Sequence, residues 1–121
     1  MKQVTRDIDL DSARDLIDRV PRARLAFASS QGPQAQPVRF VRRDDHYLVG
    51  ICKSTRYLPN PGQDVALLID EGIYYFELRA VYIRGQVQLV EAPSGAQEEC
   101  TWFEVNASRV VAWDYGSMRE V

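Results

Sequence analysis

The sequence predicts a mainly β protein: a small barrel of six to seven strands, with one helix at its N-terminal end and short connecting helices. Three observations lead to this prediction. Helical spacing of apolar residues is confined to the segment before Pro21. From Arg24 onward, short apolar segments alternate with turns rich in Gly, Pro and Asp. The 121 residues contain no repeat, low-complexity tract or linker, so residues 1–121 form a single domain.

Helical spacing near the N-terminus predicts one amphipathic helix. Asp9 or Asp11 can cap its start, and Pro21 ends it. The apolar positions of this helix are Leu10, Ala13, Leu16, Ile17 and Val20.

The next part of the chain predicts three strands joined by turns. Residues 24–29 alternate as in a strand, and the turn at 30–33 leads to a return strand over 35–42. A polar turn at 43–46 precedes a third strand over 47–51.

The middle of the chain predicts a short helix and a buried strand. Residues 53–58 read as a short helical turn that Pro59 and Pro61 end. The continuous apolar run over 65–69 predicts a strand buried on both faces, which residues 70–72 break.

The last part of the chain holds the longest predicted strand, over residues 79–90. Gly85 inside it predicts a bulge or a bend, as a barrel needs at its corners. Residues 93–99 form a loop or short helix, and residues 102–105 and 109–113 form two final strand pieces.

Composition excludes several classes of protein. The net charge of −2 argues against nucleic-acid binding, for which a net basic domain is typical. No window approaches 18 continuous apolar residues, and the acidic start lacks the apolar core of a signal peptide, so we expect a soluble cytoplasmic protein without membrane contact. Cys52 and Cys100 lack metal-ligand spacing, so reduced thiols with a structural role are expected.

Residues for direct catalysis are scarce in this sequence. The single histidine, His46, falls in a polar turn and is expected to be solvated rather than catalytic. No Ser/His/Asp set or cysteine–histidine pair can be assembled around it. An enzyme built on this chain would therefore need a cofactor for the difficult step.

Two segments are candidates for binding a cofactor. Lys53-Ser54-Thr55-Arg56 follows a strand and offers hydroxyls, cations and free N–H groups, which together can hold a phosphate; the alternative is a solvated polar loop. In residues 34–42, Pro37 cannot donate a ladder hydrogen bond, so part of this backbone is expected to be open toward a flat heterocycle; the alternative is an ordinary edge strand. Most aromatic residues are expected in the core or at an interface.

Seven segments occur in the order and spacing of a known family. They are RLAFAS at 24–29, PVRF at 37–40, YLVGI at 47–51, STR at 54–56, VALLID at 65–70, ELRAV followed by RG at 77–85, and RVVAWDY at 109–115. In this order they resemble the pyridoxamine-phosphate-oxidase-like, FMN-binding split-barrel family. The resemblance implies a Greek-key-like split barrel that forms a homodimer, with each cofactor between the two subunits.

The resemblance also assigns residues to the cofactor, FMN or the deazaflavin coenzyme F-420. The phosphate falls on Ser54, Thr55 and Arg56. The ring edge meets the backbone of Gln36, Pro37, Val38, Arg39, Val49, Gly50 and Ile51. The partner subunit contributes Trp113.

The function that the resemblance implies is an oxidoreductase that transfers a hydride to or from a small organic substrate. Arg56 stands where the family usually has Lys, and the connector after it is short and rich in proline. The chain has no counterpart of the C-terminal segment of true pyridoxamine phosphate oxidases, which argues against vitamin B6 oxidation. A non-catalytic flavin carrier or sensor is the alternative, and a haem-handling protein is a third possibility that the position of His46 disfavours.

Overall fold

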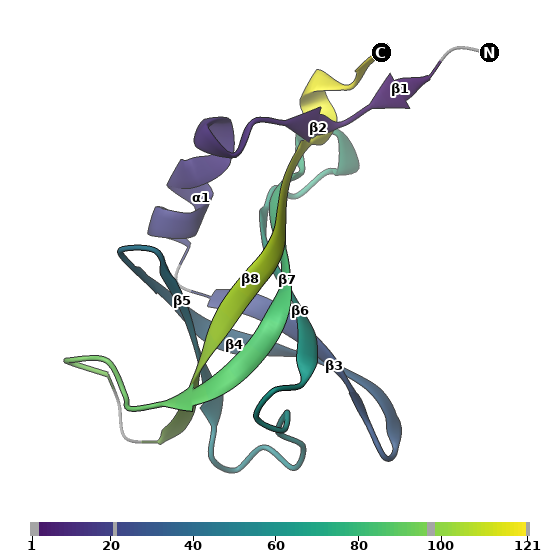
Figure 1. Cartoon of the computed structure of the whole chain (residues 1–121). Helices are drawn as coiled ribbons and strands as arrows, with labels where there is room; N and C mark the ends of the chain where they lie inside the picture. The colour runs from purple at the N-terminus through teal and green to yellow at the C-terminus, as the bar shows by residue number, and fades with distance from the viewer. Residues whose placement is uncertain (1–2, 21, 97–98, 121) are drawn as a thin grey trace.

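The structure, a computed structural model, describes residues 3–20, 22–96 and 99–120. Within them, six antiparallel strands close into a barrel in the order β8-β5-β4-β3-β6-β7, because β7 also pairs with β8 (Figure 1). These strands are β3 (Arg22–Ser29), β4 (Gly32–Arg43), β5 (His46–Cys52), β6 (Asp64–Glu71), β7 (Arg79–Val90) and β8 (Cys100–Asp114). The predicted mainly β barrel is confirmed.

Short elements surround the barrel. Strand β2 (Asp7–Ile8) adds to β8, and β1 (Val4–Thr5) pairs with β9 (Arg119–Glu120). This pairing brings the two ends of the described chain to the same end of the molecule (Figure 1). Two 3-10 segments, Tyr75–Glu77 and Tyr115–Ser117, lie near each other after β6 and β8.

The predicted N-terminal helix is confirmed as a 3-10 segment, Leu10–Ala13, that continues into α1 (Arg14–Arg19). Leu16 and Ile17 are buried against the barrel, as their helical spacing predicts. Asp9 precedes the first turn, but its side chain makes no capping hydrogen bond. Pro21, the predicted end of the helix, lies outside the described residues. No helix in the described part of the chain is long and apolar enough to cross a membrane.

Ion pairs hold α1 to the strands. The guanidinium of Arg79 donates to both carboxylate oxygens of Asp15, at 2.8 and 3.2 Å, and to Oε1 of Glu71 at 3.1 Å. These bonds hold the pKa of Asp15 far below its usual range. On the same helix Asp18 accepts a 2.7 Å hydrogen bond from Nε of Arg42 in β4. Arg19 of the helix also lies 2.8 Å from Oε2 of Glu71 in β6. The helix is thus attached to β7, β6 and β4 through charged groups as well as by its apolar face.

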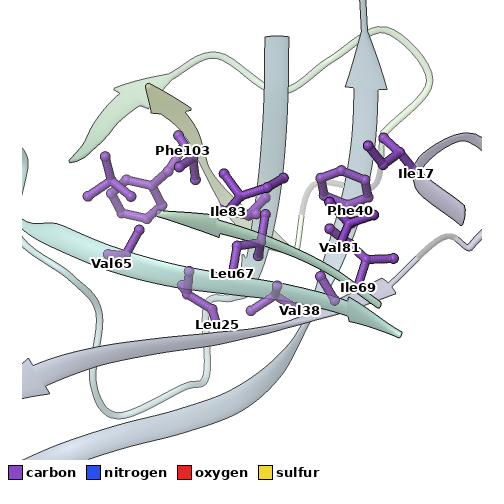
Figure 2. Packing of buried hydrophobic residues seen from close by; sticks show 14 of the residues in the cluster. Ile17, Leu25, Val38, Phe40, Val65, Leu67, Ile69, Val81, Ile83 and Phe103 are labelled. Atoms are coloured by element: carbon purple, nitrogen blue, oxygen red, sulfur yellow. The ribbon is translucent and has the colours of Figure 1, made fainter. Parts of the chain in front are cut away.

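The core forms from the inward-facing position of every second strand residue. Figure 2 shows these side chains pointing toward one another from several strands and from α1. The buried residues include Ile17, Leu25, Val38, Phe40, Val65, Leu67, Ile69, Val81, Ile83 and Phe103. Among the described residues no polar or charged side chain is buried.

Strand β6 corrects the expectation of burial on both faces. Val65, Leu67 and Ile69 are buried in the core, whereas Ala66 and Leu68 remain partly exposed on the outer face. The run is continuously apolar, yet no second layer of the described residues covers its outer side. The outer face of β6 is therefore an apolar surface of the single chain.

The bulge predicted at Gly85 is confirmed. The β7–β8 register shifts there, since Arg84 pairs with Arg109 and Gly85 with Ala107, which leaves Ser108 as the extra residue. The shift also corrects a prediction: β8 is one strand of 15 residues rather than two pieces. The extra residue reverses the inward–outward alternation, which in the sequence looks like a break between two strands.

The β7–β8 connection contains a turn in which the N–H of Ala96 donates to the carbonyl of Pro93 at 3.0 Å. This agrees with the loop predicted over 93–99, of which residues 97 and 98 lie outside the described part.

Candidate functional site

A hollow of about 370 Å³ lies on the outer face of the barrel, over β3, β4, β5 and β8. The strand registers place Arg22 opposite Arg39, and Arg39 opposite Gly50, so these three residues form one row across three strands. The hollow is lined by Arg22, Pro37, Val38, Arg39, Gly50, Cys52 and Cys100. Two guanidinium groups and no carboxylate among these residues favour an anionic ligand.

The floor of this region depends on Gly50 having no side chain. A Cβ at Gly50 would lie 2.7 Å from Cζ2 of Trp102, its cross-strand partner on β8. The indole therefore lies directly against the backbone of β5. Its Nε1 is buried and has no hydrogen-bond partner.

The segment after β5 corrects the prediction of a helical turn over residues 53–58. A single turn closes where the N–H of Thr55 donates to the carbonyl of Cys52 at 2.9 Å, and the chain then continues without helix to Pro59. Pro59 and Pro61 disfavour helical backbone at Leu58 and Asn60, the residues directly before them, which leaves room for no more than a short turn after β5. The helix-start N–H groups expected here for phosphate binding are consequently not formed as a set.

The turn nevertheless lies beside the hollow. Ser54 Oγ and Cys52 Sγ share a hydrogen bond of 3.0 Å, and Cys52 is part of the hollow's lining. On the other side, Nε2 of Gln36 lies 3.4 Å from the carbonyl oxygen of Tyr57, to which it donates. These contacts hold residues 52–57 near Gln36, in the part of β4 that has no partner on β5.

The three residues assigned to a phosphate are accessible. Ser54 and Arg56 are exposed, and Thr55 is half-buried. The guanidinium carbon of Arg56 lies 5.4 Å from the centre of the Tyr57 ring, a cation–π distance. Two hydroxyls and a guanidinium thus follow one another in a turn at the edge of the hollow, and this set can donate to phosphate oxygens.

Strand β4 has one open side over part of its length. It pairs with β3 from Gly32 to Arg39, but its register with β5 covers only Arg39 to Arg43. Residues 32–38 have no partner on β5 in this register, as the position of Pro37 led us to expect. The ring-binding role of Gln36, Pro37, Val38 and Arg39 stays a prediction, and three of the four line the hollow.

The remaining predicted residues divide into two groups. Val49 and Ile51 turn their side chains into the core, so only their backbone is available to a ligand. Trp113 lies outside this hollow. It lines a second hollow of about 370 Å³, which is mostly apolar and also includes Leu68 and Tyr82. Its ring stacks on Tyr82 at 5.6 Å between centroids. In one chain, therefore, Trp113 does not join the other predicted residues.

Sequence reasoning missed Arg22, Cys52 and Cys100 as lining residues. Arg22 lies two residues before the predicted start of its strand. Counting cross-strand pairs outward from the turn after Ser29 would have placed it opposite Arg39. The approach of Cys100 depends on the β5–β8 pairing of segments far apart in the sequence, for which no local signal exists. Among the described residues no cluster of three or more His, Cys, Asp or Glu side chains could hold a metal ion.

His46 begins β5 and is exposed, as expected, but it has a partner. Its Nδ1 lies 2.7 Å from Oε2 of Glu104, and this carboxylate raises the pKa of the imidazole above its ordinary 6.5. Because the folded-state pKa is raised, the pair stabilises the fold below about pH 6.5, and this contribution is lost as the pH rises through the folded pKa.

We expect an NMR titration of the single histidine to give a midpoint above 6.5. In Glu104→Gln the midpoint should return toward 6.5, since the amide carries no charge. A wild-type midpoint at or below 6.5, or one that the substitution leaves in place, would show that the ion pair does not form in solution.

Comparison with known proteins identifies the fold. The chain matches no family model, and no curated protein matches it in sequence. Among solved structures, it is similar to an FAD-binding protein from Mycobacterium smegmatis, with a TM-score of 0.68 and 15% identity over 93% of this chain and 96% of that one. It is similar to a proposed pyridoxamine 5'-phosphate oxidase from Corynebacterium glutamicum, with a TM-score of 0.67 and 13% identity over 98% and 100% of the two chains.

A third similar structure is the haem storage protein HutZ from Vibrio cholerae, with a TM-score of 0.65 and 15% identity over 88% of this chain and 96% of that one. At these identities the likeness shows the fold alone. The chain has the split β-barrel fold that flavin-binding and pyridoxamine phosphate oxidase-like proteins share.

Proposed function

We propose that this protein binds a phosphorylated flavin, FMN or the deazaflavin coenzyme F-420, and acts with it as an oxidoreductase on a small organic substrate. One observation carries the proposal: a cation-lined hollow on the barrel's outer face adjoins a turn that presents Ser54, Thr55 and Arg56. The FAD-binding protein of the same fold supports a flavin as the class of ligand.

The residues present fit such a cofactor. The hollow of about 370 Å³ is within the range of small-molecule sites, which is about 300–1,000 Å³. Its lining includes Arg22 and Arg39 and no acid, which suits a phosphate or an electron-rich ring edge. The open side of β4 offers backbone groups of residues 36–38 to the heteroatoms of a flat ring.

The residues around the hollow then have separate roles in binding the cofactor. The hydroxyls of Ser54 and Thr55 donate to phosphate oxygens, and the guanidinium of Arg56 adds a charge-assisted pair of bonds. The ring of Trp102, packed against Gly50, forms part of the wall at β5. The bound flavin supplies the hydride-transfer chemistry, so the chain needs no nucleophile of its own. Both thiols are free, which suits the reducing cytoplasm where we expect the protein to act.

A second copy of the chain completes the proposed site. The outer faces of β6, β7 and β8 expose an apolar surface that includes Ala66, Leu68, Tyr82 and Trp113. The following loop leaves Ile73 88% exposed and Tyr75 66% exposed. Apolar surface on this scale is typical of an interface, and a homodimer would cover the outer face of the continuously apolar β6. It would also allow Trp113 to approach the partner's cofactor.

We expect a dimer at micromolar concentration, with an interface that buries more than roughly 2,000 Å² of accessible surface in total. Light scattering measures the mass that distinguishes the dimer from the monomer. Leu68→Glu should produce monomers, because it places a charge in the proposed interface. Leu89→Glu is the matched control: Leu89 is 61% exposed and lies on β7 about 23 Å along the strand from Tyr82. A monomeric wild type, or equal dissociation by both variants, would exclude this interface.

The absorption spectrum tests the choice of cofactor. Protein purified from a host that makes flavin, deazaflavin and haem should carry the bands of one of the first two. Haem bands would instead favour haem storage, the role of the similar Vibrio cholerae protein, although His46, the single histidine, is engaged by Glu104. Flavin that binds but is not turned over by any reductant or acceptor would favour a carrier or sensor.

A further inference from the structure

The two cysteines are 48 positions apart in the sequence but lie opposite each other on two neighbouring strands. Cys52 is the last residue of β5, Cys100 is the first of β8, and the antiparallel register makes them direct partners. Residues opposite each other in a sheet point to the same face, and both cysteines line the same hollow. Both are free thiols.

The kind of strand pair matters for the distance between them. The next pair along the ladder, Lys53 and Glu99, is joined by a 2.7 Å bond from the N–H of Lys53 to the carbonyl of Glu99. Hydrogen-bonded and non-hydrogen-bonded pairs alternate along an antiparallel ladder, so Cys52 and Cys100 form a non-hydrogen-bonded pair. Such pairs have Cα atoms about 4.5 Å apart, which lies within the 4.4–6.8 Å that a disulfide spans.

Their surroundings favour reaction at one of the two sulfurs. Cys52 is exposed, and its hydrogen bond with Ser54 Oγ lowers the pKa of the thiol, which increases the reactive thiolate form. Cys100 is half-buried, and thus less open to a reagent in solution. Both lie at strand ends, next to a turn and a loop, where the backbone can adjust to the geometry of a disulfide.

We propose that Cys52 and Cys100 are a redox-active dithiol that forms a reversible intramolecular disulfide at the wall of the hollow. The oxidant class is a low-molecular-weight disulfide. The thiolate of Cys52 attacks one sulfur of the reagent, forms a mixed disulfide and releases one small thiol. The thiolate of Cys100 then attacks Cys52 Sγ and releases the second small thiol. The protein loses two electrons and two protons, and the reagent is reduced to two thiols.

This inference does not depend on the proposed flavin function, since it concerns the chain's own thiols. It replaces the purely structural role that the sequence led us to expect for both cysteines. In the oxidised form the sulfur of Cys52 turns toward Cys100 and away from Ser54.

The test treats the folded, cofactor-free chain with oxidised glutathione and then counts thiols and measures the intact mass under non-reducing conditions. Wild type should go from two free thiols to none, with a mass lower by two hydrogen atoms and no attached glutathione. The melting temperature of this product should rise by roughly 5–15 °C, because the bond closes a long loop, and dithiothreitol should reverse the change.

Cys100→Ser and Cys52→Ser are the controls. Cys100→Ser should stop at the glutathione adduct on Cys52, since its resolving thiol is missing, and Cys52→Ser should react more slowly than Cys100→Ser. Both should melt like reduced wild type, which shows that they are folded. Wild type that stops at glutathione adducts, or that forms only disulfides between chains, would overturn the proposal.

Discussion

Replacing Arg56 with alanine is expected to weaken FMN binding by about thirty- to a hundredfold. In the proposed site the change removes a charge-assisted contact to the phosphate, and losing such a contact typically costs about 2–3 kcal/mol. Ser54 and Thr55 keep their hydroxyls in this variant. Arg56 is exposed and its modest contact is with the ring of Tyr57, so the substitution should leave the fold intact.

Two further variants make this result specific. Arg56→Lys should lose less affinity than Arg56→Ala, because it keeps the charge and loses only the fork of donors. Arg109→Ala, an exposed arginine on β8 outside the hollow's lining, should bind like wild type. Titrations that follow flavin fluorescence measure all three. Equal affinities for wild type and Arg56→Ala, in a protein that binds the cofactor, would remove the phosphate from this turn.

Replacing Gly85 with alanine is expected to lower the free energy of unfolding by about 3 kcal/mol, the upper end for overpacking. The added Cβ would overlap the carbonyl oxygen of Asn106 and lie 2.7 Å from its carbonyl carbon. Both are backbone atoms of the strand paired with Gly85 at the bulge, so no side-chain rotation relieves the overlap. The barrel would have to open locally between β7 and β8.

Urea denaturation of Gly85→Ala and of Gln86→Ala tests this expectation. Gln86 is the neighbouring exposed residue on the same strand, and its truncation should change stability by less than about 0.5 kcal/mol. An unchanged urea midpoint for Gly85→Ala would mean that the two strands do not approach each other at the bulge as described.

The fold was predictable because it depends on local patterns. The helical spacing of Leu16 and Ile17 and the alternation in β3, β4 and β7 are properties of short segments, and each produced the predicted element. Gly85 also carries its signal locally, because a glycine inside a long strand has few other uses. Two local patterns point to the wrong structure. Ser108 makes one strand look like two, and Pro59 and Pro61 look like the end of a helix that does not form.

The candidate site was less predictable because it depends on which strands become neighbours. Arg39 and Gly50 come together through the β4–β5 register, and a hairpin turn allows that register to be counted from the sequence. Cys100 reaches the hollow through the pairing of β5 with β8, which about fifty intervening residues separate. In the single chain Trp113 lies by Leu68 and Tyr82, away from the other predicted residues, and its approach to a partner's cofactor stays a prediction.

The central claim is that the turn at Ser54, Thr55 and Arg56 binds the cofactor's phosphate. The most direct test compares the affinity of each cofactor with the affinity of the same compound without its phosphate. Riboflavin has the ring and ribityl chain of FMN but no phosphate, and the deazaflavin has an equivalent lacking its phosphate. Fluorescence titration of the wild-type protein should show that FMN or the deazaflavin coenzyme binds at least about thirtyfold more tightly than its dephosphorylated form, since Ser54, Thr55 and Arg56 then have a partner. Failure of both cofactors to bind, or equal affinity with and without the phosphate, would contradict the account.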